Sequence, residues 1–296
     1  MQQQPPQIDE PLVRALVAEQ FQRWADLPVR AVPTPGWDNR SFMLGSGMVL
    51  RLPSAPAYAA QVPREQRWLP YLRRHLPYEI PQPLAQGRPG GGYPFAWSVY
   101  RWIDGDTVAS RPPSDMHRFA TDLAQFLNAL RAVAAADGPA AGEDNFHRGG
   151  ALEVYDAEAR TAFAVLRGRI DVEAALSVWD AGLASVWEQP PVWVHGDIAT
   201  GNLLLRAGRL AAIIDFGLCC IGDPACDLAM AWSYFGATER ETFRAALGLD
   251  ASTWQRGKAW ALWKAAIVTA GIAQTTPAEA QAARRTLDQV LTLQTS

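Results

Sequence analysis

The sequence predicts an α+β protein with two lobes, a small β-rich lobe at the N-terminus and a larger, mostly helical lobe at the C-terminus. Short strand-like runs punctuated by glycine and proline fill the first third of the chain. Beyond residue 106 the pattern changes to long stretches rich in alanine and leucine, which is typical of helices. We therefore expect one lobe over residues 1–103 and the other over residues 104–296, with a ligand cleft between them.

The elements of the N-terminal lobe follow from apolar spacing and turn residues. Apolar side chains recur at helical spacing over residues 10–25, and a second helix is expected over residues 57–75, with a kink at Pro70. The expected strands are residues 29–33, 41–44, 48–52, 81–85 and 95–103. The small lobe is therefore a sheet that carries one helix between its strands.

The C-terminal lobe is predicted to be helical apart from one compact β segment. Helices are expected over residues 114–135, 151–167 and 171–187. The helical pattern resumes at Cys226 and continues to the end, with breaks near residues 236, 248–250 and 275–277. The β segment comprises residues 192–194, 203–205 and 211–214.

Composition excludes several classes of protein. The 296 residues include 27 basic and 30 acidic side chains, and 49% are hydrophobic, so a large core is expected and disorder is not. The slightly acidic balance, without long basic runs, argues against nucleic acid as a partner. The only lysines are Lys258 and Lys264, which excludes any function that needs a lysine in the first 250 residues.

The N-terminus lacks the apolar region of a signal peptide, and no stretch of 18 apolar residues occurs in the chain. We therefore expect a cytoplasmic protein without a membrane partner, and a monomer is favoured. Cys219, Cys220 and Cys226 lie within eight residues. Such an odd, crowded set predicts reduced thiols in a packed turn rather than disulfides or a zinc site.

A strand–loop–hairpin pattern over residues 192–217 carries most of the chemical information. The strand leads into a tight loop with His195 and Asp197, Asn202 follows at the end of the loop, and the hairpin returns Asp215 to the same neighbourhood. Two carboxylates and a carboxamide predict a Mg²⁺ site with one spare carboxylate. Aspartate also favours turns, but ordinary turn residues do not account for the complete H-G-D-x4-N pattern followed by D-F-G.

This pattern resembles the catalytic loop and metal-binding segment of kinases. The H-G-D variant, with Gly196 where protein kinases carry arginine, is similar to the aminoglycoside phosphotransferase family of small-molecule kinases. Residues 222–229 resemble that family's signature after D-F-G, and residues 36–45, 49–53 and 98–105 look like its nucleotide loop, third strand and hinge. The resemblance covers nearly the whole chain. It implies a protein-kinase-like fold, ATP or GTP as phosphate donor, Mg²⁺ as cofactor and a small-molecule hydroxyl as acceptor.

The resemblance assigns catalytic and metal roles residue by residue. Asp197 matches the catalytic aspartate that orients the acceptor hydroxyl, and Asn202 and Asp215 match the Mg²⁺ ligands. His195 matches the motif histidine, which we interpret as structural, with its imidazole bonded to backbone.

The nucleotide site is expected to use arginine in place of lysine. Arg51 stands where the family's phosphate-binding lysine is expected, and Glu65 stands where the carboxylate partner of that lysine is expected. Glu79 is a weaker competitor for the partner role. An exposed strand residue is the alternative interpretation of Arg51, and a solvated helix charge is that of Glu65.

Two further segments are expected to contact the nucleotide. Asn39 and Ser41, with the backbone N–H groups around them, could cradle phosphate oxygens, although a plain hairpin turn would look similar. Backbone groups of the hinge at Tyr100, Trp102 and Ile103 are expected to meet the adenine edge, although any buried strand would show the same apolar run.

Two aspartates after the D-F-G segment allow structural interpretations. Asp223 before Pro224 is typical of a helix N-cap followed by proline at the first helical position. Asp227 could buttress the catalytic loop, and the sequence does not separate that role from an exposed helix residue.

The acceptor is not determined by the motifs, because one fold serves many substrates. The last 65 residues carry few carboxylates but several tryptophans, which argues against a polycationic aminoglycoside and mildly for a more hydrophobic antibiotic such as a macrolide. Trp260 and Trp263 have the spacing of helix core instead. A metabolite kinase acting on an amino alcohol, sugar or amino-acid derivative, and a catalytically silent nucleotide-binding module, are the alternative functions. The absence of a P-loop motif and of a nucleophile elbow excludes those two enzyme classes.

Overall fold

The computed structural model describes residues 7–33, 36, 38–135 and 137–292. Residue 37 of the predicted nucleotide loop lies outside the described residues. The N-terminal part folds into a sheet, as predicted. One helix precedes the sheet in sequence, and a second helix lies between its third and fourth strands. The helices are α1 (Glu10–Gln20) and α2 (Gln61–Leu72), with short 3₁₀ turns at Gln22–Trp24 and Pro56–Tyr58.

The N-terminal sheet is antiparallel and has the strand order β1-β2-β3-β5-β4. Its strands are β1 (Val29–Ala31), β2 (Asn39–Leu44), β3 (Met48–Pro53), β4 (Pro83–Gly87) and β5 (Trp97–Arg101). In the centre of the sheet, Arg51 on β3 pairs in register with Ser41 on β2 and with Ser98 on β5. This position directs the Arg51 side chain from the middle of the sheet toward α2 and the C-terminal part.

The C-terminal part is mostly helical. Its helices are α3 (Met116–Ala132), α4 (Asp156–Val165), α5 (Val172–Leu183), α6 (Met230–Ser233), α7 (Ala237–Leu247), α8 (Ala251–Thr269) and α9 (Pro277–Thr292). Its strands are β6 (Asp106–Thr107), β7 (Val192–Val194), β8 (Leu203–Arg206), β9 (Arg209–Ile213) and β10 (Cys220–Gly222). Strands β6, β8 and β9 form one small sheet, and β7 pairs with β10 in another.

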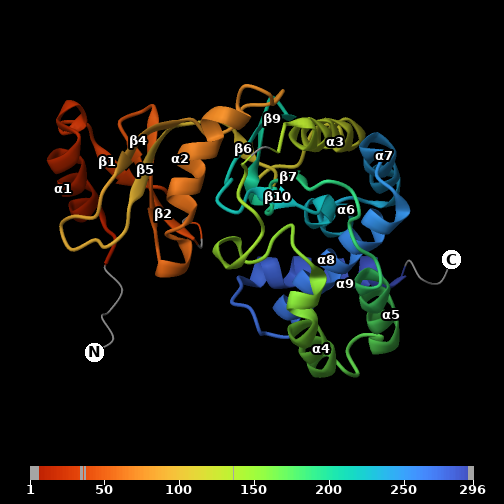
Figure 1. The fold of residues 1–296 in the computed structure, drawn as a ribbon. Helices are drawn as coiled ribbons and strands as arrows, with labels where there is room; N and C mark the ends of the chain where they lie inside the picture. The colour runs from red at the N-terminus through yellow and green to blue at the C-terminus, as the bar shows by residue number, and fades with distance from the viewer. Residues whose placement is uncertain (1–6, 34–35, 37, 136, 293–296) are drawn as a thin grey trace.

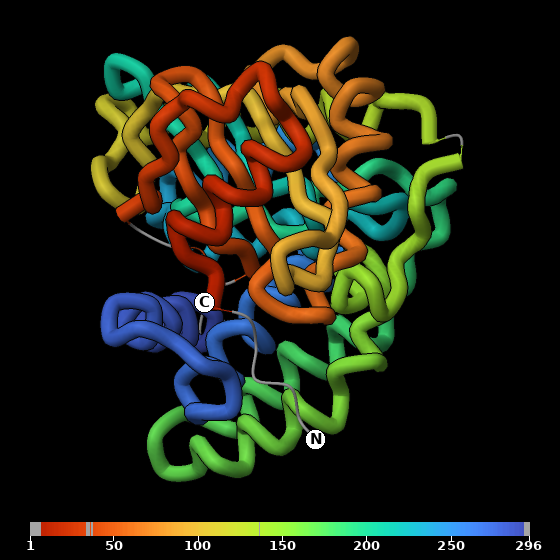
Figure 2. The backbone as a smooth tube through the Cα atoms, turned by 90° about the vertical axis from the view of Figure 1, so that its left-hand side faces the viewer, coloured from red at the N-terminus to blue at the C-terminus, as the bar shows by residue number. Residues whose placement is uncertain are grey.

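Figure 1 shows the N-terminal sheet on one side of the molecule, the helices of the C-terminal part on the other, and α2 between them. Seen from the side of the sheet, helices α4, α5, α8 and α9 lie below it in green and blue (Figure 2). The short strands β7 to β10 lie next to α2, in the middle of Figure 1. The arrangement places the predicted catalytic segment, residues 192–217, at the junction of the two parts.

Two apolar cores hold the fold. One lies between α1 and the sheet and runs from Val13 to Val99. The larger core joins the C-terminal helices, and the end of α2 contributes Leu69 and Leu72 to it. Burial of apolar side chains is the main stabilising term, so α2 is fixed to the C-terminal part as well as to the sheet.

The α+β class and the order of elements are as predicted, and two details differ. The expected helix over residues 57–75 is shorter, since a 3₁₀ turn at Pro56–Tyr58 precedes α2 and the helix ends at Leu72, with Pro70 inside its last turn. The sequence prediction lacks strands β6 and β10. Each has only two or three residues, which is too short to show an alternating apolar pattern. Their pairing with β8 and β7 exists only in the folded chain.

The predicted state of the cysteines is confirmed, since Cys219, Cys220 and Cys226 are free and buried. Burial raises the pKa of Cys220 to about 12, so its thiol stays protonated at neutral pH. None of the helices in the described part of the chain has the length and apolar character that a bilayer crossing needs.

Candidate active site

The loop after β7 has a backbone that only glycine fits at its second position. Gly196 has φ of +83°, and a Cβ atom there would lie 2.8 Å from the Leu218 carbonyl oxygen. The Asp227 carboxylate accepts hydrogen bonds from the N–H groups of His195, at 2.7 Å, and Gly196, at 2.8 Å. Asp227 is 3% exposed. It therefore buttresses the loop, which resolves the two interpretations that the sequence left open.

His195 bonds backbone at both ring nitrogens, as expected. Its Nε2 atom lies 3.1 Å from the Ile214 carbonyl oxygen, and Nδ1 accepts from the Asp197 N–H at 3.2 Å. The ring also packs edge-on against Phe216, with centroids 4.5 Å apart. The fully buried imidazole thereby fixes the position of Asp197 relative to the segment that carries Asp215.

Asp197 is held from two sides. Its Oδ2 atom accepts from Asn202 Nδ2 at 2.9 Å, and its Oδ1 atom lies 3.2 Å from the ammonium group of Lys264 on α8. Burial alone would raise the pKa of Asp197, but the positive charges of Lys264 and Arg148 and the contribution of His195 outweigh it and lower the pKa below the ordinary value. The carboxylate is therefore ionised at neutral pH and can accept a hydrogen bond from a hydroxyl group.

Asp215 has left-handed backbone, with φ of +69°. Its Oδ1 atom accepts from Arg51 Nη2 at 2.6 Å, while Arg51 Nη1 donates to Glu65 Oε1 at 3.2 Å. Glu65 also accepts from the Tyr100 hydroxyl. The predicted competitor, Glu79, pairs with Arg206 instead. The guanidinium of Arg51 thus bridges the carboxylate of α2 and that of the D-F-G segment.

Arg51 remains charged in this setting. Burial opposes its charge, but the carboxylates of Asp215 and Glu65 outweigh that cost and raise the pKa of Arg51 above its ordinary value. Its side chain is 16% exposed, against 4% for that of Glu65. The alternative interpretations, an exposed strand arginine and a solvated helix glutamate, do not describe these two residues.

The oxygen atoms of Asn202 and Asp215 fit a divalent cation. The Ile214 N–H donates to the Asn202 carbonyl at 2.9 Å, which brings Asn202 next to Asp215. Both hydrogen bonds of the Asn202 amide nitrogen go to Asp197, so the amide oxygen is left for another partner. Among the described residues, no three His, Cys, Asp or Glu side chains group as ligands of one ion. Such a sparse set of hard oxygens suits Mg²⁺, which takes its other ligands from phosphates and water.

The structure does not bring every predicted nucleotide contact to this cluster. Asn39 is buried and its amide nitrogen lies 3.4 Å from Gln61 Oε1, while Ser41 lies in β2 opposite Arg51. In the hinge, the side chain of Tyr100 is directed to Glu65. The Trp102 N–H already donates to the Gly47 carbonyl at 2.9 Å.

The hinge also contributes apolar surface. The indole of Trp102 donates to Asp104 at 2.7 Å. Ile103 is 8% exposed and packs with Leu204 and Ala212. Ile103 therefore belongs to a small apolar cluster under β8 and β9.

Sequence reasoning missed three charged residues of this site. The positive charges of Lys264 and Arg148 lower the pKa of Asp197. Asp38 is a third carboxylate, and its charge interacts with those of Asp215 and Asp197. Burial raises the pKa of Asp38, and the neighbouring carboxylates add to the effect. The scarcity of lysine was a signal for Lys264, since one of the two lysines contacts the predicted catalytic residue. Nothing in the local sequence singles out Arg148 or Asp38.

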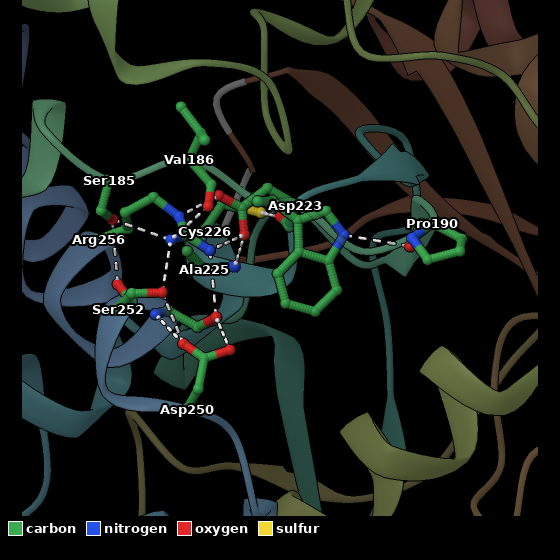
Figure 3. A network of polar contacts seen from close by, with 11 residues as sticks. Ser185, Val186, Pro190, Asp223, Ala225, Cys226, Asp250, Ser252 and Arg256 are labelled. Carbon is green, nitrogen blue, oxygen red and sulfur yellow. Dashed lines mark hydrogen bonds and ion pairs between the residues drawn. The ribbon is translucent and has the colours of Figure 1, made fainter.

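Figure 3 shows a polar network around Asp223 and Arg256. Asp223 caps the 3₁₀ turn Pro224–Leu228 by accepting from the Ala225 N–H at 3.0 Å, as predicted. The same carboxylate accepts two hydrogen bonds from Arg256 of α8, at 2.6 and 3.2 Å. Arg256 donates further to Ser185 and Ser252. The network fixes α8 to the turn that carries Asp227.

Replacing Arg256 with methionine should destabilise the protein by about 3–5 kcal/mol, because it leaves the Asp223 carboxylate without its charged partner in a buried setting. The Arg256 side chain is 3% exposed. The matched control is Arg111→Met, whose ion pair with Asp106 is exposed and should contribute less than about 1 kcal/mol. Chemical unfolding of the two variants measures the difference, and equal losses would contradict the importance of the buried pair.

Comparison with known proteins identifies the family and the fold of the chain. Residues 30–260 match the model of the phosphotransferase enzyme family, APH. A search of curated proteins by sequence gives no match.

Solved structures match the fold over nearly the whole chain. The GDP complex of wild-type aminoglycoside 2'-phosphotransferase-IIIa is 18% identical, with a TM-score of 0.70 over 97% of this chain and 100% of that one. The apoenzyme of macrolide 2'-phosphotransferase MphH from Brachybacterium faecium is 20% identical, with a TM-score of 0.62 over 96% of this chain and 97% of that one. The family match covers most of the sequence, and the chain therefore belongs to the phosphotransferase enzyme family.

Proposed function

We propose that this phosphotransferase moves the γ-phosphate of ATP or GTP to a hydroxyl group of a small molecule, with Asp197 as the catalytic residue. The observation that carries the proposal is one connected cluster. Glu65, Arg51 and Asp215 form a continuous chain of ion pairs, and Asp197 and Asn202 lie beside it. Residues from the sheet, from α2 and from the catalytic loop thus meet at one place.

In the proposed reaction, the ionised Asp197 accepts a hydrogen bond from the acceptor hydroxyl and aims its oxygen at the γ-phosphorus. The new bond forms between that oxygen and phosphorus, and the bond to the oxygen that bridges the β- and γ-phosphorus atoms breaks. The nucleoside diphosphate leaves with the electron pair of the broken bond, and the hydroxyl proton passes to Asp197 or to solvent. Arg51 is proposed to bind the donor phosphates from the side of the sheet.

We assign the nucleotide-binding lobe to residues 1–103 and the catalytic and acceptor-binding lobe to residues 104–296. The complete N-terminal sheet and the smaller apolar core lie before residue 103, which supports this division. Asn39, Ser41 and the hinge at Tyr100, Trp102 and Ile103 stay proposed as nucleotide contacts of that lobe.

The test of the proposed function is an acceptor screen. Purified protein is incubated with ATP or GTP, Mg²⁺ and a mixed panel of antibiotics, amino alcohols, sugars and hydroxy acids, and products are identified by mass spectrometry. We expect at least one acceptor to gain a phosphate. Nucleotide binding without transfer to any acceptor, and without slow transfer to water, would instead identify a catalytically silent module.

Asn202 and Asp215 are proposed to hold Mg²⁺. When bound, the ion would supply positive charge that offsets the negative charge developing on the donor phosphates during transfer. Chelation of divalent cations should therefore abolish transfer. Asn202→Ala should raise the Mg²⁺ concentration that gives the half-maximal rate by about tenfold or more. Loss of a residue that only hydrogen-bonds a metal ligand already lowers metal affinity by about that factor. The measurement is the rate as a function of Mg²⁺ concentration, and an unchanged requirement in this variant would rule out Asn202 as a ligand.

A further inference from the structure

Two cations, Lys264 and Arg148, lie near Asp197. The two carboxylate oxygens of Asp197 have separate partners, since Oδ2 accepts from Asn202 and Oδ1 from Lys264. Lys264 comes from the last turns of α8, and its side chain is 48% exposed. Its ammonium group therefore lies at the edge of the catalytic residue and remains open to solvent and to a ligand.

Arg148 is the second cation, and it is held by aromatic rings instead of by a carboxylate. Its guanidinium carbon lies 5.9 Å from the ring centroid of Tyr155, 5.4 Å from that of Trp260 and 4.8 Å from that of Trp263. Arg148 also lies against the catalytic loop, since a Cβ atom added to Gly196, the residue before Asp197, would be 3.1 Å from Arg148 Cβ. A cation seated on aromatic faces is attracted without being neutralised.

Two hydrogen-bond donors around Arg148 have no acceptor in the described part of the protein. Within the part of the chain that the structure describes, the Nη1 atom of Arg148 and the Nε1 atom of Trp260 are buried without a hydrogen-bond partner. Such donors cost free energy unless something accepts from them. The nearby Glu158 carboxylate does not serve, because it accepts from Trp263 Nε1 at 2.8 Å and forms no ion pair with Arg148 in the described residues.

We propose that the acceptor substrate carries an anionic group, a carboxylate or a phosphate, that Arg148 and Lys264 bind beside Asp197. The inference rests on the proposed function and adds the class of acceptor. A guanidinium fork and an ammonium group together are a common recognition pair for such oxygens. A polycationic acceptor would instead meet two positive charges next to the catalytic carboxylate.

The experiment measures binding of small probes by calorimetry, independently of phosphate transfer. The protein is first saturated with a non-hydrolysable ATP analogue and Mg²⁺, so that the donor site is filled. The probes are 3-phenyllactate, its methyl ester and phenyl phosphate. We expect at least one anion to bind about tenfold more tightly than the neutral ester, and the tighter anion identifies the preferred group.

The variants Lys264→Gln and Arg148→Gln should each remove most of this preference. Lys258→Gln is the matched control, because it removes the other lysine of α8 and that residue interacts electrostatically with Arg240 rather than with Asp197. If Arg148→Gln fails to fold, the more exposed Lys264→Gln still decides the result.

Several outcomes would overturn the proposal. They are equal affinity for ester and anions, no binding of either anion, anion binding only when the nucleotide analogue is left out, and a preference that survives Lys264→Gln. Because the readout is binding, a protein that transfers no phosphate can still show the preference. Failure of the proposed function and failure of this inference are therefore distinguishable.

Discussion

Replacing Asp197 with asparagine is expected to lower phosphate transfer on the order of a thousandfold while leaving nucleotide affinity nearly unchanged. An amide keeps the size of the side chain, and its oxygen can still accept from Asn202 Nδ2. It loses the negative charge that is proposed to orient the acceptor hydroxyl and that pairs with Lys264. The measurements are the transfer rate at saturating substrates and the dissociation constant of the nucleotide.

The control for this variant is Asp106→Asn, which removes an exposed carboxylate whose partner is Arg111. Its transfer rate should stay within about twofold of that of the natural sequence, because surface substitutions away from a site have small effects. Transfer by the Asp197 variant at the natural rate would exclude Asp197 as the catalytic residue. Loss of transfer together with loss of nucleotide binding would indicate a structural effect instead.

Replacing Arg51 with methionine should have a comparably large effect, for two separable reasons. It removes the cation proposed to bind the donor phosphates, so kcat/KM for the nucleotide should fall on the order of a hundredfold. It also leaves Glu65, whose side chain is 4% exposed, without its charged partner, which should destabilise the fold by about 3–5 kcal/mol. Nucleotide kinetics and chemical unfolding measure the two effects.

The double variant Arg51→Met with Glu65→Gln separates stability from function. Glutamine removes the buried negative charge and can still accept from the Tyr100 hydroxyl, so much of the lost stability should return. Nucleotide affinity should not return, because the cation proposed to bind the donor phosphates is still absent. Recovery of both would show that Arg51 has only a structural role.

Arg51→Lys tests whether the guanidinium itself is needed. Nη1 and Nη2 donate to two different carboxylates, and a single ammonium group cannot reproduce that planar geometry. We expect about a tenfold loss in kcat/KM for the nucleotide. Full activity of the lysine variant would show instead that arginine here reflects the general preference of a chain in which only two of 27 basic residues are lysine.

Much of the fold could be predicted because its elements have strong local patterns. Helix α8 combines an aspartate cap at Asp250 with a long apolar pattern, and α3 begins in the same way at Asp115. The short strands β6 and β10 could not be predicted, because their only support is a partner strand distant in sequence. The 3₁₀ turn before α2 could not be predicted either, because an α-helix and a 3₁₀ turn have similar local sequence preferences.

By itself, the sequence determined which residues make up the core of the candidate site. His195, Asp197, Asn202 and Asp215 lie on one strand, one loop and one hairpin, so their proximity follows from local chain geometry. The reduced, buried state of the three cysteines could also be predicted from the sequence, because buried free thiols close together in the chain need no distant partner.

Only the tertiary structure decided what surrounds that core. Arg51 reaches Asp215 across 164 residues of sequence, and Lys264 reaches Asp197 across 67. The packing of α2 and α8 against the catalytic segment selected Glu65 over Glu79 and placed Lys264 beside Asp197. Contacts of this kind depend on how buried faces fit together over the whole chain, and no periodicity or motif near a single residue specifies that fit.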